Sequence, residues 1–213
     1  MAKILKIEVT RPKKQIGEIH LSDGRKIETH LESVYKYFLD KGKEIDEETI
    51  EHIIDDYDYF ALRSYGINLV GRRFYTEKEI RDKLKERAID YRNVQKVINQ
   101  LLKYDYINDE IYAEKYIKDA KRIKKHGNIK IKHNLMQKGV DENIISKILA
   151  DTHEELEDSN WDNIVKLCRK KRKSYIGQEP YKIKQKLYQY LSRRGYVSGE
   201  IKKAIEYVES HQD

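Results

Sequence analysis

The sequence predicts an all-α protein: three tandem three-helix repeats in an elongated curved array, preceded by a small N-terminal antiparallel β element. Three observations support this fold class. Apolar residues recur at helical spacing over most of the chain, with only Pro12 and Pro180 as prolines. The hydrophobic and charged fractions are both 38%, which suits several small cores better than one round core. One pattern of apolar residues also returns three times along the chain.

The β element is expected in the first 45 residues. Residues 3–9, 15–21 and 25–31 alternate apolar and polar side chains, as half-buried strands do. Asp23-Gly24 lies between the last two runs, and this dipeptide is the strongest short signal for a hairpin. We therefore assign residues 1–45 to a β-hairpin or small sheet with a short helix.

The first helical repeat is assigned to residues 46–105. Asp46 can cap a helix running to about Gly71. Thr76 and Glu79 form a capping box that opens a second helix, and Asp90 can cap a third. The first helix is expected to bury Ile50, Ile53, Ile54, Tyr57, Phe60 and Ala61.

The same pattern continues in residues 106–155 and 156–213, which we assign to the second and third repeats. Leu84, Leu135 and Leu191 are equivalent, and each stands four residues after Ile80, Ile131 or Leu187. Their preceding helices are expected over about 108–125 and from near 161. These leucines are predicted to lie in three equivalent cores.

The second helix of each repeat is expected to end at an equivalent position. Gly139 and Gly195 follow this helix in the second and third repeats, where a left-handed residue is favoured, whereas the first repeat has Ala88. If all three helices end alike, Ala88→Gly should be neutral or stabilising. If residue 88 is right-handed, glycine should cost roughly 0.5–1 kcal/mol instead.

The formal net charge of +7 is unevenly distributed: −4 over residues 1–58, +5 over 59–108, −1 over 109–158 and +7 over 159–213. A basic surface of this kind favours a polyanionic partner. The single cysteine, Cys168, stands at a core spacing and is predicted to be a buried structural thiol. With no apolar run long enough for a signal peptide or membrane span, we expect a cytoplasmic protein without membrane contact.

No catalytic motif is recognised, and we expect no catalytic residues, no cofactor and no metal. A Walker loop, a GxGxxG sequence and an HExxH sequence are all missing. His126 and His133 are separated by Gly127 and do not form a metal pair. The acidic runs 55–58 and 154–158 are interpreted as solvated helix ends or a linker.

Several segments resemble the repeat signatures of the RecX family. The first-repeat signature is matched by Ala61-Leu62 and by residues 72–84, followed by residues 106–113 and Tyr116. The second is matched by Gly127, Ile131, Leu135 and residues 138–140, and the third by residues 184–191 and 193–195. Asn108 and Tyr112 depart from the family's more common Asp and Phe, but they keep the capping and core-edge chemistry.

The resemblance implies a non-catalytic regulator of the RecA recombinase. Such a protein binds the RecA–DNA filament and usually suppresses ATP hydrolysis, strand exchange and co-protease function. The expected partners are the RecA filament and, non-specifically, single- and double-stranded DNA, with the protein acting as a monomer.

Basic side chains are the candidate contacts to the filament or its DNA, and Tyr75, Tyr181 and Tyr188 could stack on bases. Any of these cations could equally lie on a solvated helix face. Alternative functions are a DNA-binding module without a RecA target, including a helix-turn-helix reader, and a metal-dependent nuclease. The candidate cations are Arg72, Arg73, Lys121, Arg122, Lys124, Lys125, Lys130, Lys132, Arg169, Lys170, Lys171, Arg172, Lys173, Lys182, Lys184, Lys186, Arg193 and Arg194.

Overall fold

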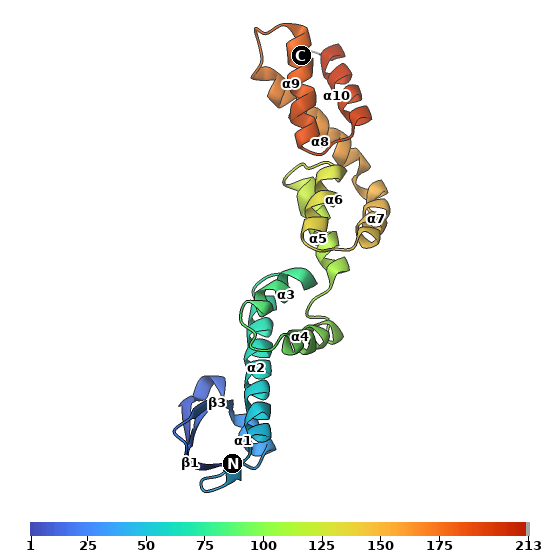
Figure 1. Cartoon of the computed structure of the whole chain (residues 1–213). Coiled ribbons are helices and arrows are strands. Elements are labelled where there is room, and N and C mark those ends of the chain that lie inside the picture. The colour runs from blue at the N-terminus through green and yellow to red at the C-terminus, as the bar shows by residue number, and fades with distance from the viewer. Residues whose placement is uncertain (212–213) are drawn as a thin grey trace. The chain divides into compact units, whose positions relative to one another are not determined.

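The computed structural model describes residues 1–211, with the backbone alone described for residues 153–159. The chain divides into two compact units, Met1–Ile107 and Asn108–Asp213. Figure 1 shows the elements of both units.

The N-terminal part of unit 1 is an antiparallel sheet, as predicted. Strands β1 (Ala2–Arg11), β2 (Ile16–Leu21), β3 (Lys26–His30) and β4 (Glu44–Ile45) pair in the order β3-β2-β1-β4. Gly24 turns the β2–β3 hairpin with a φ of 89°, a conformation that glycine adopts without strain. The sequence did not indicate the short β4 or the 3₁₀ turn η1 (Pro12–Lys14) between β1 and β2. Helix α1 (Leu31–Lys36) follows β3.

Helix α2 (Glu47–Val70) connects the sheet to the first helical repeat (Figure 1). Its side-chain cap is Asp46, which accepts a hydrogen bond from the Thr49 amide at 2.9 Å. Ile50 and Ile53 pack into the core of the sheet, whereas Leu62 and Leu69 pack into the core of the repeat. The buried stripe thus passes from one core to the next along a single helix.

Two residues expected in the α2 core are exposed. The side chain of Ile54 is 37% exposed, and Ala61 also faces solvent. The stripe contains Asp58 and Gly66 instead, because the repeat core approaches α2 from the side on which these residues lie. Tyr57 and Phe60 are half-buried rather than buried.

The rest of the first repeat follows the prediction. Thr76 and Glu79 form the expected capping box at α3 (Glu77–Lys85), and Asp90 caps α4 (Tyr91–Lys103). Ile80 and Leu84 from α3 are fully buried. They pack against the apolar face of α4, which contributes Val94, Val97, Ile98 and Leu101.

The acidic run 55–58 is neither a helix end nor a linker, so that interpretation was wrong. It lies within α2, and Asp58 is only 3% exposed. Its carboxylate accepts hydrogen bonds from the amides of Ile89 at 2.9 Å and Asp90 at 3.2 Å, and from the Asn93 side chain at 3.0 Å. A buried carboxylate is tolerated here because it binds donors at the start of α4. The side chains of the second run, 154–158, lie outside the described residues.

Unit 2 contains the second and third repeats. The second is formed by α5 (Asp109–Arg122), α6 (Asn128–Gln137) and α7 (Glu142–Asp151). The third is formed by α8 (His153–Lys173), α9 (Pro180–Arg193) and α10 (Ser198–Ser210), so α8 begins earlier than the sequence suggested. Leu135 and Leu191 are 0% exposed, as is Leu84 in the first repeat, and the predicted equivalence of the three leucines is confirmed.

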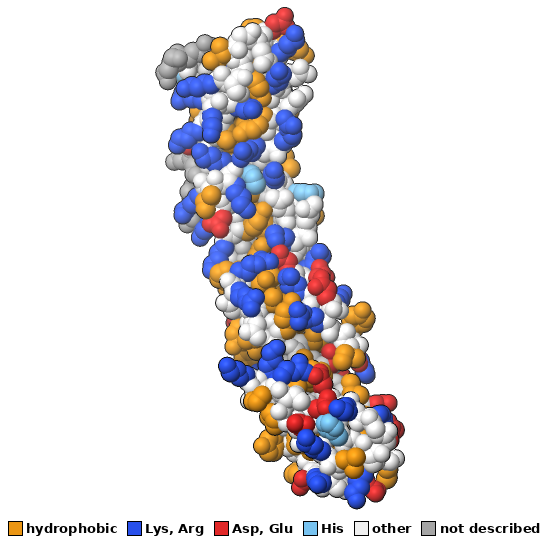
Figure 2. All heavy atoms as spheres, turned by 90° about the vertical axis from the view of Figure 1, so that its left-hand side faces the viewer, with side chains coloured by type: hydrophobic (Ala, Val, Ile, Leu, Met, Phe, Trp, Pro, Cys, Tyr) orange, Lys and Arg blue, Asp and Glu red, His pale blue; other side chains and the backbone are white. Residues whose placement is uncertain are grey.

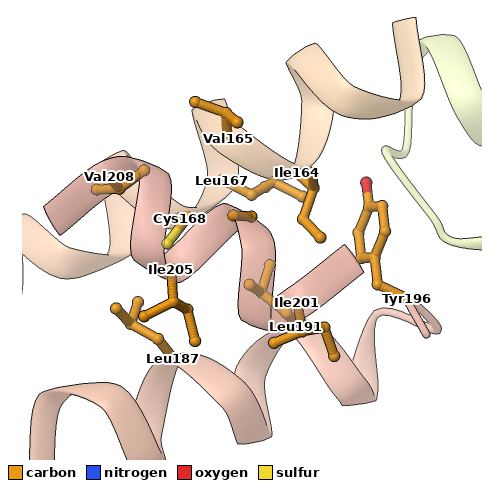
Figure 3. Close-up of a cluster of buried hydrophobic side chains, with 11 residues drawn as sticks. Ile164, Val165, Leu167, Cys168, Leu187, Leu191, Tyr196, Ile201, Ile205 and Val208 are labelled. Carbon is orange, nitrogen blue, oxygen red and sulfur yellow. The ribbon is translucent and has the colours of Figure 1, made fainter. Parts of the chain in front are cut away.

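The core of the third repeat is closed by all three of its helices. Figure 3 shows Ile164 and Cys168 from α8 directed toward Leu191 from α9 and Ile201 and Ile205 from α10. Cys168 is fully buried, and this burial raises its pKa to about 11. The thiol is therefore structural, as predicted.

The second and third repeats meet through a backbone contact between two glycines. The Gly127 amide donates to the carbonyl of Arg194 at 2.9 Å, and the Ile129 amide donates to the carbonyl of Gly195 at 3.1 Å. The N-terminus of α6 thus binds carbonyls at the end of α9, which satisfies groups that helix termini leave open. A Cβ on Gly127 would lie only 2.2 Å from the Gly195 oxygen, so only glycine permits this approach.

Candidate nucleic-acid interface

Lysine and arginine side chains lie against tyrosine rings across both repeats of unit 2. In the second repeat, the Lys124 ammonium lies 5.3 Å from the centre of the Tyr116 ring. Tyr116 comes from α5, and its hydroxyl accepts a hydrogen bond from Asn134 on α6 at 2.9 Å. The ring is thus fixed by two helices, and the lysine is held over it by a cation–π contact.

Arg194 continues this arrangement into the third repeat. Its guanidinium donates to the carbonyl of Lys124 at 2.7 Å and lies 5.5 Å from the centre of the Tyr190 ring. The glycine contact described above brings the end of α9 to the α5–α6 turn, so that Arg194 can reach Lys124. The cations of the two repeats therefore become neighbours.

Two more lysines extend the surface along α8 and α9. The Lys171 ammonium lies between two rings, 5.7 Å from Tyr190 and 5.2 Å from Tyr175. Lys186 lies 5.4 Å from the centre of the Tyr175 ring and donates to Gln178 at 2.7 Å. We define the basic tyrosine face as Lys124, Lys171, Lys186 and Arg194 with Tyr116, Tyr175 and Tyr190.

The electrostatics of this face favour an anion. Within the described part of the chain, none of its four cations forms an ion pair with a carboxylate. Nearby, burial lowers the pKa of His126, and the charges of Lys130, Arg194 and Lys124 lower it further. Figure 2 shows Lys and Arg side chains gathered over the upper part of the drawn face, which belongs to unit 2, with few acidic side chains among them. Phosphates would supply the missing counter-charge.

Other predicted cations already have acidic partners. The ion pairs are Arg73–Glu79 at 3.6 Å, Lys132–Glu142 at 2.5 Å, Lys182–Glu179 at 3.1 Å and Lys184–Glu209 at 2.8 Å. Their charge is partly neutralised, which makes them weaker candidates than the unpaired cations. Lys121 is only 3% exposed, and burial lowers its pKa, so it does not belong to a surface.

The basic run 169–173 divides among different sides of α8. Lys171 lies over the rings of the basic tyrosine face, whereas Arg169 lies 5.8 Å from the centre of the Tyr207 ring on α10. Lys170 and Lys173 face solvent, and Arg172 is half-buried. Of the remaining candidates, the exposed ones are Arg72, Arg122 and Arg193, and the half-buried ones are Lys125 and Lys130.

The tyrosines of the face are not those singled out from the sequence. Tyr75 is buried under Arg73, Tyr181 is 73% exposed, and the Tyr188 hydroxyl donates to Ser198 at 3.0 Å. A usable signal was nevertheless present. Lys171 stands four residues before Tyr175, and Arg194 stands four residues after Tyr190, which is the spacing of neighbours on a helix.

In the part of the chain that the structure describes, no group of three His, Cys, Asp or Glu side chains is placed to hold a metal ion. Among the same residues, none of the helices has the length and apolar character needed to cross a membrane.

Each of the three repeats matches its own model in a comparison with known protein families. Residues 63–101, 108–149 and 157–205 match the models of the first, second and third three-helix domains of RecX. The chain is 33% identical over 216 residues to the regulatory protein RecX of Clostridium acetobutylicum, covering 99% of this chain and 98% of the relative. The chain belongs to the RecX family. A relative from Clostridium perfringens strain 13, also named regulatory protein RecX, is 34% identical over 92% of this chain and 91% of its own.

Solved structures of RecX proteins agree with this membership. A crystal structure described as regulatory protein RecX matches with a TM-score of 0.75 and 26% identity, covering 97% of this chain and all of that chain. RecX from Lactobacillus salivarius matches with a TM-score of 0.65 and 27% identity, covering 72% of this chain and 98% of its own. The RecX resemblance and the mostly helical fold expected from the sequence are therefore confirmed.

Proposed function

We propose that this chain modulates the RecA recombinase by binding the RecA–DNA filament and suppressing its ATPase, strand-exchange and co-protease activities. The family supports a regulatory role, since the relatives are named regulatory proteins. The observation that carries the contact to the filament is the basic tyrosine face, whose cations lack acidic partners in the described residues.

The proposed mechanism is steric and electrostatic. Small repeats in series provide much surface for little core, which suits contact with several protomers of a filament. The cations of the basic tyrosine face would bind phosphates of the filament's DNA and block the approach of a second duplex. Each exposed cation–π contact is worth about 0.5–1 kcal/mol, little enough for a phosphate to displace the cation and free the ring for a base.

This function needs no chemistry of the chain's own. We propose that it acts without catalytic residues, cofactor or metal, and as a monomer. A target bound to chromosomal DNA would place it in the cytoplasm.

The decisive experiment is co-sedimentation with preformed RecA filaments, compared with naked single strands at matched salt. We expect more protein to sediment with filaments than with naked DNA, and RecA's ATP hydrolysis to fall. Replacing the four cations of the basic tyrosine face by glutamine should weaken filament binding and leave the chain folded, because Lys124 and Lys186 are exposed, Lys171 and Arg194 are half-buried, and none of the four forms an ion pair in the described residues. A matched control removes the same number of positive charges by replacing four lysines that already form ion pairs: Lys132, Lys166, Lys182 and Lys184.

Salt dependence identifies what the face touches. Each lost contact to a single-strand phosphate should flatten the log–log salt slope by roughly 0.7. Weaker binding with an unchanged slope would assign the face to the RecA surface rather than to DNA. Unchanged binding of the folded variant, with loss of binding in the control, would reject the face as the contact.

The second candidate function is a DNA-binding module without a RecA target, since the same unpaired cations would serve it. It predicts equal binding to filaments and naked strands, and no effect on RecA's ATP hydrolysis. We propose the exposed cations Arg169, Lys170 and Lys173, together with the half-buried Arg172, as secondary contacts for both functions. The variant carrying Arg169→Gln, Lys170→Gln, Arg172→Gln and Lys173→Gln tests them separately.

A further inference from the structure

Unit 1 contains a basic cleft that the RecA proposal does not use. The cleft has a volume of about 570 Å³ and lies between the 3₁₀ turn η1, the start of α1 and the middle of α2. Ligand pockets of small molecules usually measure roughly 300–1,000 Å³, so this cleft is large enough for one nucleotide.

The charges that line the cleft are mostly positive and unpaired. Five cations line it: Arg11 is paired with Glu28, whereas Lys13, Lys14, Arg63 and Arg87 have no carboxylate partner in the described part of the chain. Glu32 is the acid of the lining. Four unpaired cations beside a single acid of the lining leave an excess of positive charge, and the binding of an anion would relieve the repulsion between them.

The backbone that carries two of the cations is also fixed before any ligand binds. Lys13 and Lys14 lie on η1, which is closed by a 3.0 Å hydrogen bond from the Gln15 amide to the carbonyl of Pro12. Gln15 adopts a left-handed φ of 55°, and its carbonyl accepts from the Leu31 amide at 2.8 Å. The turn is thereby fixed against the start of α1, which reduces the entropy that ordering would cost on binding.

The inner side of the cleft supplies a polar anchor and aromatic rings. Arg63 donates through Nε to Gln100 at 3.0 Å, which orients its guanidinium. The His30 and Phe60 rings stack with their centres 4.3 Å apart, and the Arg87 guanidinium lies 4.0 Å from the centre of the Tyr65 ring. A phosphate with an adjoining base would find both cations and ring surface here.

We propose that this cleft binds a nucleotide unit, with the phosphate on Lys13, Lys14 and Arg63 and the base on the aromatic side. The nucleotide could be free or part of a single strand, since the chemistry recognised is the same. The site is independent of the basic tyrosine face, because every group that forms it belongs to unit 1. A negative result for the proposed action on RecA would therefore leave this proposal unaffected, and the reverse also holds.

The test is an NMR titration of the full chain with thymidine 5′-monophosphate. We expect the signals of Lys13, Lys14, Gln15 and the His30 ring to shift. Binding should be specific for the phosphate, so thymidine without it should leave these signals in place. The variant Lys13→Gln/Lys14→Gln should raise the apparent Kd roughly tenfold, the effect of losing charge-assisted contacts.

The matched control is Lys41→Gln/Lys85→Gln, which removes the same charge from exposed lysines of unit 1 outside the cleft. It should leave the Kd within about twofold. Equal Kd values for the two variants, or equal binding of thymidine, would overturn the proposal. Equal or tighter binding of hexaglutamate at the same signals would also overturn it and assign the cleft to an acidic peptide.

A thymidine tetranucleotide distinguishes the two sources of the nucleotide. Tighter binding than the monophosphate at the same signals assigns the cleft to a strand, whereas equal affinity assigns it to a free nucleotide. Site-resolved signals are needed because a strand can also contact unit 2.

Discussion

The first and third repeats bury equivalent leucines but end their second helices in different ways. In the third repeat, Gly195 adopts a left-handed φ of 85°, and the next amide, that of Tyr196, donates to the carbonyl of Leu191. In the first repeat, Ala88 keeps a negative φ, and its own amide donates to the carbonyl of Leu84 at 3.0 Å. The first repeat therefore closes its helix one residue earlier.

The reason lies in what each turn binds next. After Ala88, the amides of Ile89 and Asp90 are taken up by the buried Asp58 carboxylate of the same repeat. At the end of α9, the carbonyls of Arg194 and Gly195 accept amides from the neighbouring second repeat. One turn serves its own repeat and the other joins two repeats. The equivalent buried leucines are thus common to the repeats, whereas the hydrogen bonds at the end of the second helix differ with the groups that each turn contacts.

The largest expected effect tests what the repeats share. Leu84→Ala, Leu135→Ala and Leu191→Ala should each destabilise the protein by roughly 2–5 kcal/mol, through lost burial and the cavity left behind. Urea unfolding followed by circular dichroism measures the cost. A cost below about 1 kcal/mol at one position would show that its core collapses around the alanine and that the three cores are not equivalent.

The contact between the second and third repeats is tested by Gly127→Ala. The backbone φ of Gly127 is −75°, so alanine brings no conformational strain of its own. Its methyl would nevertheless meet the Gly195 carbonyl and disturb two backbone hydrogen bonds. We expect a loss of about 2–3 kcal/mol from overpacking and weakened hydrogen bonds, with faster amide exchange at residues 127 and 129.

Gly199→Ala is the control for that variant. Gly199 lies in the first turn of α10 and has no atom within 4 Å of an added Cβ. Alanine there should stabilise the protein slightly, by about 0.5 kcal/mol, because it reduces the freedom of the unfolded chain. Similar losses in both variants would remove the argument for a special glycine contact.

A change at Asp58 tests the way in which the first repeat closes. Asp58→Asn keeps the size of the side chain but replaces one acceptor oxygen by an NH2 group. This NH2 group would face N–H donors, to which it cannot donate a hydrogen bond. The cost should be about 2 kcal/mol, since a buried donor loses its partner. Asp55→Asn, on a partly exposed carboxylate, should cost less than about 1 kcal/mol. Thermal melts of the two variants compare their stabilities directly. Equal costs would contradict the role of the buried Asp58 carboxylate as the acceptor for the amides before α4.

Sequence reasoning succeeded where one local pattern decides the structure. Helical spacing placed Leu84, Leu135 and Leu191, and capping chemistry placed the starts at Thr76 and Asp90, because these signals act within a few residues. It failed at Asp58, whose burial depends on donors more than thirty residues away in the chain. Nothing local distinguishes such a carboxylate from a solvated one.

The four cations of the basic tyrosine face were named from the sequence, but the way in which the two candidate sites are assembled was not, for a related reason. The rings of Tyr116 and Tyr190 belong to one surface only because Arg194 reaches Lys124 across two repeats. In unit 1, Arg11, Lys13 and Lys14 form a short basic run in a segment whose net charge is negative, a run that the sequence analysis did not single out. Only the fold, however, shows that it faces Arg63 on α2. Spacing finds cores and caps, whereas surfaces assembled from distant elements require the tertiary structure.

A pair of small effects, at Ala88 and at its counterpart Gly139, separates the two kinds of helix ending most sharply. Repeat equivalence alone predicted that Ala88→Gly is neutral or stabilising, but the negative φ of Ala88 removes that reason. Ala88 is half-buried against the first core. Glycine should therefore cost about 0.5–1 kcal/mol through unfolded-state entropy.

The reciprocal change, Gly139→Ala, should cost roughly 1–2 kcal/mol because the φ of Gly139 is 86°. If the endings differ, both exchanges lower the thermal midpoint. A rise in the midpoint for Ala88→Gly, together with a fall for Gly139→Ala, would show that residue 88 takes the left-handed conformation in solution and that the three repeats end alike.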